Sequence, residues 1–268
     1  MDTLSTEQFD RIAGTAHRLW GLALTDRKMQ LVSSRLSRFL RQRPFSSIAA
    51  YLDHLETTAT EAEKLEFFDM LSTNTTSFFR EMGAFHWLER ELWTPLSRGA
   101  LTLPGRRVRI WSAACSTGQE PYSIAMHMRE HLQGDWDVKI LASDLARSVL
   151  VAATRGLYED DAVKAVPTEM RDRWFSREGD RWRIAPELQS LISFRMDNLI
   201  EPFRFKGPFD VIFCRNVMIY FDRETRQQIV QRLAELLRPG GALIVGSSES
   251  LSGIESGLRI VQPSVYVR

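Results

Sequence analysis

The sequence has few cysteines and no long apolar run, and both absences narrow what the chain can be. Only two cysteines, Cys115 and Cys214, occur in 268 residues, so we expect neither a disulfide-rich scaffold nor a four-ligand structural metal site. No apolar stretch approaches the roughly 18 to 20 residues that a membrane helix needs. The amino terminus carries Asp2, Glu7 and Asp10 instead of the basic-then-apolar pattern of a signal peptide. We therefore expect a cytoplasmic protein with no metal and no direct membrane insertion.

A strong charge of either sign is also missing. The net charge is +1, which argues against a chain built to bind nucleic acid. The charges are unevenly placed, however. Residues 27–43 hold six basic side chains and no acidic one, whereas residues 53–69 hold six acidic side chains. Such runs are usually solvated helix faces, but the basic run, with Arg35 and Arg38, is also a candidate surface for docking an acidic partner.

Residues 1–85 are expected to form an all-helical domain. Ser5 and Gln8 have the spacing of a helix capping box, and Thr25 is a candidate cap for a second helix that stops before Pro44. Apolar residues recur at helical spacing within both segments. The polar run 72–77 that follows is typical of helix caps.

From Val108 onwards the pattern changes to alternating strands and helices. Strands are predicted at 108–113 and 138–143, each followed by a helix, which indicates a parallel sheet that binds ligands at the carboxyl ends of its strands. A hairpin that turns at Glu178-Gly179-Asp180 interrupts this order and predicts a small inserted β-subdomain at about 158–194. Further strands are predicted at 193–196, 209–214, 242–246 and 264–268. The expected fold of residues 86–268 is therefore Rossmann-like α/β.

The loop after the first strand is a candidate cofactor site. Residues 113–118 are small, with a single glycine, and a helix with Pro121 in its first turn follows. Asp144 ends the second strand, where a carboxylate holds ribose hydroxyls in nucleotide-binding folds, although it could equally cap the next helix. Together these features predict an adenosine-containing cofactor. The G-x-G-x-x-G spacing is absent, which disfavours a dehydrogenase that uses a nicotinamide dinucleotide.

Several segments resemble a known family. The acidic residue after the second strand, and a helix that runs into Leu237–Gly241 before an apolar strand, are similar to class I S-adenosylmethionine-dependent methyltransferases. Three longer segments, 74–80, 111–123 and 213–221, resemble the chemotaxis receptor methyltransferases, the CheR family. The resemblance covers essentially the whole chain.

The resemblance implies a reaction and its partners. S-adenosylmethionine would donate a methyl group to glutamate side chains of membrane chemoreceptors, forming γ-glutamyl methyl esters for chemotactic adaptation. A glutamate carboxylate has a reference pKa of about 4.3, so such an enzyme, a protein-glutamate O-methyltransferase, needs no general base. The implied partners are the glutamate-rich cytoplasmic methylation helices of the receptors. We expect a cytoplasmic monomer that is recruited to membrane receptor arrays.

The resemblance also implies roles for individual residues. Arg80, which neutralises a carboxylate, and Tyr220, which shapes the methyl-transfer site, are the catalytic candidates, and Arg35 and Arg38 would dock the receptor. The expected cofactor-binding residues are Asn74, Thr76, Arg80, Glu120, Asp144, Asn198, Leu199, Arg215 and Asn216. In this set Asp144 takes the ribose, Asn198 and Leu199 the adenine, and Arg215 and Asn216 the methionyl side. From the residues alone, Glu120 is also explained as a helix charge and Tyr220 as core.

The sequence departs from the family pattern at two places. The turn 178–180 is shorter than in relatives that use this hairpin to hold a receptor tail, so we expect direct docking instead. Gln119 stands where many relatives have an acid.

A methyltransferase acting on nucleic acid or a small molecule is one alternative function, although Arg215–Met218 lacks the Pro-Pro-aromatic run of base-amino methyltransferases. A cofactor-sensing module without catalysis is the other.

Overall fold

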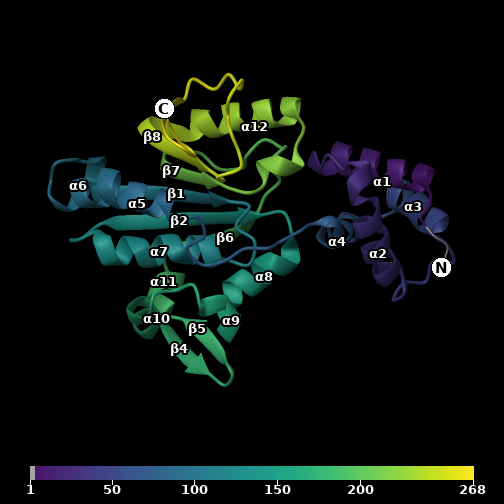
Figure 1. The fold of residues 1–268 in the computed structure, drawn as a ribbon, viewed down its shortest axis with the longest axis horizontal. Coiled ribbons are helices and arrows are strands. Elements are labelled where there is room, and N and C mark those ends of the chain that lie inside the picture. The colour runs from purple at the N-terminus through teal and green to yellow at the C-terminus, as the bar shows by residue number, and fades with distance from the viewer. Residues whose placement is uncertain (1–3) are drawn as a thin grey trace.

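The computed structural model describes residues 4–268, so Asp2 lies outside the described residues. Figure 1 shows a cluster of helices from the first part of the chain beside a larger sheet domain, with a small β-subdomain extending from the latter. Among residues 4–268, no helix combines the length and the apolar content that crossing a bilayer requires.

The amino-terminal domain is all-helical, as predicted. Its elements are α1 (Thr6–Trp20), the 3-10 turn η1 (Asp26–Lys28), α2 (Met29–Leu40), α3 (Ile48–Thr57) and α4 (Glu61–Leu71). The Ser5–Gln8 capping box is confirmed, because each side chain accepts a hydrogen bond from the other residue's backbone N–H. Thr25 makes no side-chain cap, and a 3-10 turn precedes α2 at this end.

A mostly parallel sheet of seven strands forms the second domain, which confirms the predicted class. Its strands are β1 (Arg107–Ala113), β2 (Asp137–Asp144), β6 (Ile192–Met196), β7 (Phe209–Cys214), β8 (Leu237–Val245), β9 (Arg259–Gln262) and β10 (Val265–Val267), in the spatial order β6-β2-β1-β7-β8-β10-β9. The last two run antiparallel to their neighbours. β9 was not predicted, because its exposed residues lack a buried alternation. Residues 237–241 do not end a helix as expected; they already belong to β8.

Helices flank the sheet and connect its strands. They are α5 (Gly83–Leu88), the π-helical turn η2 (Glu89–Trp93), α6 (Thr94–Ser97), the 3-10 turn η3 (Pro104–Arg106), α7 (Gln119–His131), α8 (Arg147–Arg155), α9 (Asp160–Val163), α10 (Thr168–Trp174), α11 (Pro186–Gln189), the 3-10 turn η4 (Met218–Tyr220) and α12 (Arg223–Leu236). The inserted sheet, β3 (Leu157–Glu159), β4 (Phe175–Glu178) and β5 (Arg181–Ile184), contains the predicted hairpin. Its third strand, β3, was missed because it is only three residues long.

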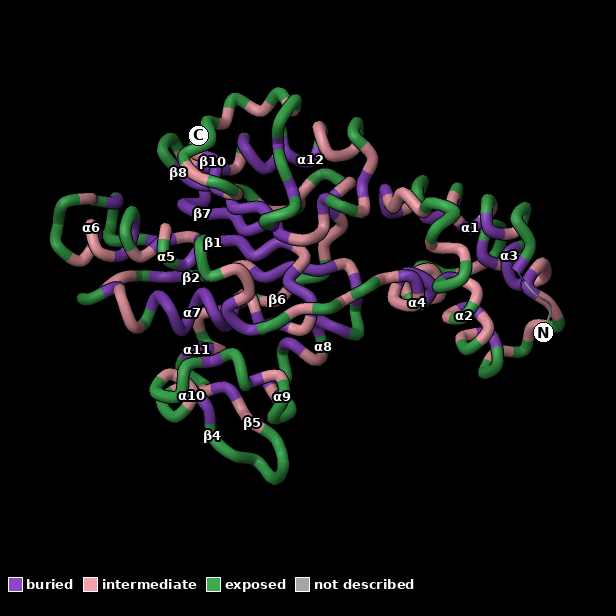
Figure 2. The backbone as a smooth tube through the Cα atoms, in the orientation of Figure 1, coloured by how far each residue is buried: buried purple, intermediate pink, exposed green. Residues whose placement is uncertain are grey.

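Three apolar clusters hold the molecule together. Neighbouring residues of β1, Ile110 and Trp111, belong to different clusters, which places one core on each face of the sheet. Figure 2 shows buried chain concentrated along these central strands. The third cluster fills the helical domain and includes Ala146 and Val149, which come from the start of α8 in the sheet domain. The two domains therefore share one packed face.

Candidate functional site

A cavity of about 300 Å³ lies where the helical domain meets the carboxyl ends of the parallel strands. Its walls come from the segment after α1, from the linker between α4 and α5, and from the loops that follow β1, β2, β6 and β7. Ten of the residues predicted for the site line it: Asn74, Thr76, Arg80, Glu120, Asp144, Asn198, Leu199, Arg215, Asn216 and Tyr220. Arg35 and Arg38 do not line it.

The loop after β1 is fixed from two sides. The Ser116 backbone N–H donates to Asp144 Oδ2 at 2.8 Å, and the Ser116 hydroxyl donates to the Asn74 carbonyl at 2.8 Å. Asp144 Oδ1 also accepts from the Ala146 N–H at 2.9 Å, so the carboxylate fixes the turn that leads into α8, although α8 itself has no side-chain cap. Burial raises the pKa of Asp144, while these N–H donors lower it. Each oxygen keeps a lone pair for a hydroxyl in the cavity.

Backbone strain is concentrated in the same region. Five non-glycine residues with positive φ flank the cavity or its loops: Phe79 (51°), Glu81 (56°), Ala114 (58°), Ser116 (49°) and Asn216 (59°). Such conformations cost of order 1 kcal/mol each, and they persist where surrounding contacts enforce them. Their accumulation here marks a site whose geometry is held by the rest of the fold.

A buried arginine joins the loop after β7 to α7 and to the linker. Arg215 is 5% exposed and donates to Glu120 at 3.1 Å, to Glu81 at 3.0 Å and to the Arg80 carbonyl at 2.5 Å. Burial raises the pKa of Glu120, partly offset by Arg215 and by the Ser112 hydroxyl. The pKa of Glu81 is lowered, because the hydrogen bond and charge of Arg215 outweigh burial. Arg215 Nε is buried and has no partner within the described chain.

Glu249 is a site-organising residue that sequence reasoning missed. It is 5% exposed, and its carboxylate accepts from the backbone N–H groups of Asn216 at 2.7 Å, Gly246 at 2.8 Å and Ile219 at 3.2 Å. These bonds hold Asn216 in its left-handed conformation and start the turn that carries Tyr220. Glu81 was missed as well; it lies one residue beyond the segment 74–80 that carried the resemblance.

The loop after β6 provides an amide, an apolar side chain and a carboxylate. The Asn198 side-chain amide donates to the Leu19 carbonyl at 3.1 Å, so it also ties α1 to the sheet domain. Leu199 is buried and lines the cavity beside it. Asp197, which was not predicted, also lines the cavity; its Oδ2 is buried without a partner among residues 4–268, and burial raises its pKa to about 6.

Three partly exposed residues bring charge and a hydroxyl to the cavity. Lys28 Nζ lies 4.7 Å above the Tyr220 ring, and Arg80 donates to the Thr75 carbonyl at 3.2 Å. Burial raises the pKa of the Tyr220 hydroxyl, with Arg80 and Arg35 opposing it, so the phenol stays protonated at neutral pH. Burial, followed by the charge of Arg35, lowers the pKa of Lys28. Lys28 belongs to the predicted basic run but was not assigned to the site.

The two predicted docking arginines differ in environment. Arg35 donates to the carbonyls of Leu71 and Ser72, each at 2.7 Å, and to the Thr73 hydroxyl at 3.1 Å. It therefore caps the end of α4 and holds the first part of the linker. Arg38 is exposed.

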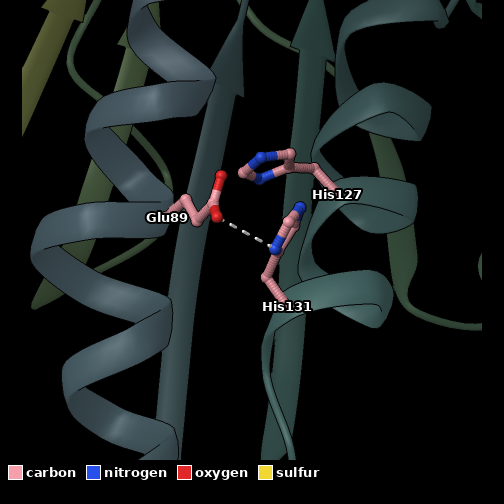
Figure 3. Close-up of side chains that lie close together, drawn as sticks. All are labelled: Glu89, His127 and His131. Carbon is pink, nitrogen blue, oxygen red and sulfur yellow. Dashed lines mark ion pairs between the residues drawn. The ribbon is translucent and has the colours of Figure 1, made fainter.

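A second group of titratable side chains lies elsewhere, between η2 and α7. Figure 3 shows Glu89, His127 and His131 close together, with Glu89 and His131 3.5 Å apart. His127 Nδ1 accepts from the Trp93 indole at 3.0 Å, so the proton of the neutral ring is on Nε2. Burial, helped by the nearby histidines, lowers the His127 pKa to about 3. The ring as placed offers no free lone pair to a metal ion, and we interpret the group as helix packing.

The fold and the cavity together define a class. A mostly parallel sheet with a carboxylate after its second strand, a tight loop after its first, and a polar cavity at the strand ends is a Rossmann-like domain built for an adenosine-containing cofactor. The helical domain and the linker that cover this cavity are additions to that class.

Comparison with known proteins identifies the family. Residues 74–267 match the CheR methyltransferase SAM-binding domain, and residues 7–72 match the CheR methyltransferase all-alpha domain. The chain is 40% identical over 267 residues to chemotaxis protein methyltransferase 2 of Pseudomonas aeruginosa, with 97% of this chain and 92% of that protein covered. It is 38% identical over 272 residues to the chemotaxis protein methyltransferase of Escherichia coli, with 98% and 91% covered. The chain belongs to the CheR family of S-adenosylmethionine-dependent chemotaxis protein methyltransferases.

The cavity residues fit this cofactor. Asp144 keeps lone pairs for ribose hydroxyls, and the unpartnered oxygen of Asp197 can accept from an amino group. The unpartnered Nε of Arg215 is a buried cationic donor suited to a carboxylate. Apolar surface from residues such as Leu199 and Phe85 completes the wall.

Proposed function

We propose that this methyltransferase acts on glutamate side chains of membrane chemoreceptors and forms γ-glutamyl methyl esters, as a protein-glutamate O-methyltransferase. The observation that carries the proposal is the charge of the cavity. Lys28, which lies over the Tyr220 ring, and Arg80, whose charge acts on the protonated Tyr220 hydroxyl, both line the cavity and are partly exposed, and no histidine among the described residues lines it. These two cations attract an anionic acceptor, which needs no general base. Asp197, the unpartnered carboxylate of the cavity, follows β6 beside Asn198 and Leu199, the candidates for adenine binding.

The chemistry follows from this arrangement. When bound, S-adenosylmethionine supplies a methyl group on a sulfonium sulfur, which an ionised carboxylate can take without losing a proton. Arg80 and Lys28 would orient that carboxylate by charge, and the Tyr220 hydroxyl would donate a hydrogen bond to the oxygen that does not react. Positioning of this kind can contribute several kcal/mol, up to roughly 7 to 11 in ideal cases.

The same proposal gives roles to the other lining residues. Asp144 would hold the ribose, and Asn198 and Leu199 the adenine. Arg215 and Asn216 would take the methionyl side, with Asn74 and Thr76 covering it from the linker. Glu120 would act on this network through Arg215, its hydrogen-bond partner at 3.1 Å.

We further propose that the partners are the glutamate-rich cytoplasmic helices of chemoreceptors. The enzyme would work as a monomer at the cytoplasmic side of receptor arrays, without inserting into the membrane or binding nucleic acid. Arg38, exposed on α2, would contribute to docking. The tight turn at Gly179, where φ is +63°, leaves little loop to grip a receptor tail, which favours direct docking.

A methyl-ester assay tests the proposal. The protein would be incubated with methyl-labelled cofactor and membranes that contain chemoreceptors, and the methanol released by mild base would be quantified. We expect base-labile label with the native protein and its loss with Asp144→Ala and with Arg80→Ala, while Arg98→Ala, an exposed change outside the cavity, leaves it intact. Cofactor binding by calorimetry without any labile label on functional receptors would refute a receptor methyltransferase and favour the sensing module.

A further inference from the structure

A second cavity, a groove of about 360 Å³, lies between α8 and the edge strand β6. It is lined by Arg147, Leu150, Val151, Thr154, Arg155, Phe194, Arg195 and Met196. None of these residues lines the cofactor cavity, and the proposed reaction leaves the groove without a role.

The charge of the groove is of one sign. Three of its eight lining residues are arginines and none is acidic. Among residues 4–268, the structure pairs none of Arg147, Arg155 and Arg195 with a carboxylate, although most arginines of the neighbouring insert, such as Arg177, Arg181 and Arg183, have such partners. Arg195 lies over the Phe205 ring, 5.7 Å from its centroid. The charge of Arg195 also acts on Asp197, but without an ion pair, so the three arginines leave the groove positive and favour an anionic ligand.

The groove is also unusually apolar for an exposed surface. Val151 is 45% exposed and Met196 is 49% exposed, and they are two of only seven large apolar residues that are exposed in the described chain. Surface apolar residues that gather in one depression, with cations around them, are typical of interaction sites. A free inorganic anion would make no use of this apolar floor.

The spacing on α8 identifies the shape of the ligand. Arg147, Val151 and Arg155 follow one another at intervals of four residues, so they form one stripe on the helix. The two arginines are separated by eight residues, or about 12 Å along the axis. A facing helix would match this stripe if it carried carboxylates about two turns apart with an apolar residue between them.

We propose that the groove between α8 and β6 docks an acidic amphipathic helix of the chemoreceptor, as a second contact outside the cofactor cavity. The inference rests on the proposed function, which supplies a glutamate-rich helical partner. α8 suits this position, because its other face, through Ala146 and Val149, packs into the core of the helical domain. A helix bound in the groove would thus contact α8, the element that joins the sheet domain to the helical domain.

Charge reversal tests the groove. The full-length Arg147→Glu/Arg155→Glu variant would be compared with Arg98→Glu/Arg129→Glu, which makes the same charge change at exposed positions that line neither cavity. Calorimetry would measure binding to a soluble cytoplasmic chemoreceptor fragment and, separately, to S-adenosylmethionine. We expect the groove variant to bind the fragment roughly tenfold more weakly and to keep its cofactor affinity. Its fragment binding should also depend less on salt concentration than that of the control variant.

Each other outcome overturns the groove proposal. Equal losses in both variants would mean a bulk charge effect, and unchanged binding by the groove variant would remove the groove from the interface. In a third measurement, each variant would be tested for binding to mixed phosphatidylglycerol and phosphatidylcholine vesicles. If only the groove variant loses vesicle binding while it still binds the fragment, the groove binds a membrane surface instead of a receptor helix. Fragment binding is measured without turnover, so failure of the methyl-ester assay would be recognised separately.

Discussion

Carboxylates around the cofactor cavity differ in what balances their charge, and this decides what each can do. Glu120 and Glu81 are paired with Arg215, and Asp144 and Glu249 are satisfied by backbone N–H groups. Glu120, Glu81 and Glu249 therefore hold geometry, whereas Asp144 fixes its loops and keeps lone pairs for the proposed ribose contact. Asp197 stands apart, because the structure gives its buried oxygen no partner within residues 4–268.

Glu249→Gln tests the role of the missed carboxylate. Three N–H groups converge on its two oxygens, so an amide necessarily turns a donor toward a donor. We expect a loss of about 1 to 3 kcal/mol in the free energy of unfolding and weaker cofactor binding, as Asn216 moves. Urea unfolding and calorimetry would check this, with the exposed Glu255→Gln as the control. Normal cofactor affinity in the Glu249 variant would show that Asn216 does not depend on it.

Asp197 predicts a pH dependence of stability. Its pKa rises from 3.8 to about 6 on burial, so the folded state holds its proton more tightly than the unfolded state does. Stability should therefore fall as the pH rises from about 4 to 6 and stay lower above that range. We expect Asp197→Asn to raise the free energy of unfolding of the cofactor-free protein by about 1 to 2 kcal/mol at pH 7.5 and by little at pH 4. Urea titrations at both pH values measure this, and Asp180→Asn, at an exposed turn, should show no such difference.

At the scale of elements, the linker between α4 and α5 is the part on which the cavity depends most. Arg35 holds its first carbonyls, and the Ser116 hydroxyl holds the Asn74 carbonyl. Further along, the Phe79 N–H donates to the Ser123 hydroxyl at 2.9 Å. The linker is thus fixed by α2, by the loop after β1 and by α7.

Arg35→Ala separates two roles for this residue. If Arg35 positions the linker, cofactor affinity should fall about tenfold, because several hydrogen bonds to the linker are lost together. Arg35→Lys should rescue little of it, since one ammonium cannot reproduce the fork. Arg38→Ala, at an exposed site on the same helix, should leave cofactor affinity unchanged. Calorimetry with S-adenosylmethionine would measure these affinities. An Arg35 variant that loses affinity for the receptor but not for the cofactor would show that Arg35 only docks the receptor.

Elements and site residues differ in how far sequence predicts them. The buried strand 209–214 and Asp144 at the end of β2 could be predicted, because burial pattern and position at a strand end are local properties. Glu81 could not, since its role arises from Arg215, which is 134 residues away. Residues 237–241 misled because a Pro-Gly-Gly run is typical of a helix end. Here Leu237 already pairs with Phe209 of β7, and the glycines bond to Arg268 within an irregular part of β8.

The whole molecule is organised by a helix that belongs to both domains. α8 begins next to Asp144, and Ala146 and Val149 on it pack into the helical domain. Leu22 also pairs with Phe221 across the domains, and His17 lies 2.6 Å from Asp222. The cavity therefore exists only when the domains are packed together.

Val149→Asp tests this dependence. The side chain is 5% exposed, and an unpaired carboxylate there costs several kcal/mol, which should separate the domains. We expect cofactor binding to be lost although Val149 does not line the cavity, and hydrogen exchange to increase in α1–α4. Val151→Asp, two residues on at a 45% exposed position, should keep both properties. Normal cofactor binding in the Val149 variant would show that the sheet domain forms the site alone.

The packed face between the two domains also limits how this protein can be recombined. The two family matches meet near residue 73, which suggests a natural point at which to exchange domains between relatives. A chimera joined there would keep Arg35 with the Ser72 carbonyl that it binds and Ser116 with the Asn74 carbonyl, but Ala146 and Val149 would pack into a helical domain from the other parent. Compatible exchange therefore requires parents that share this face, including the pair His17 and Asp222 and the bridge between Leu22 and Phe221.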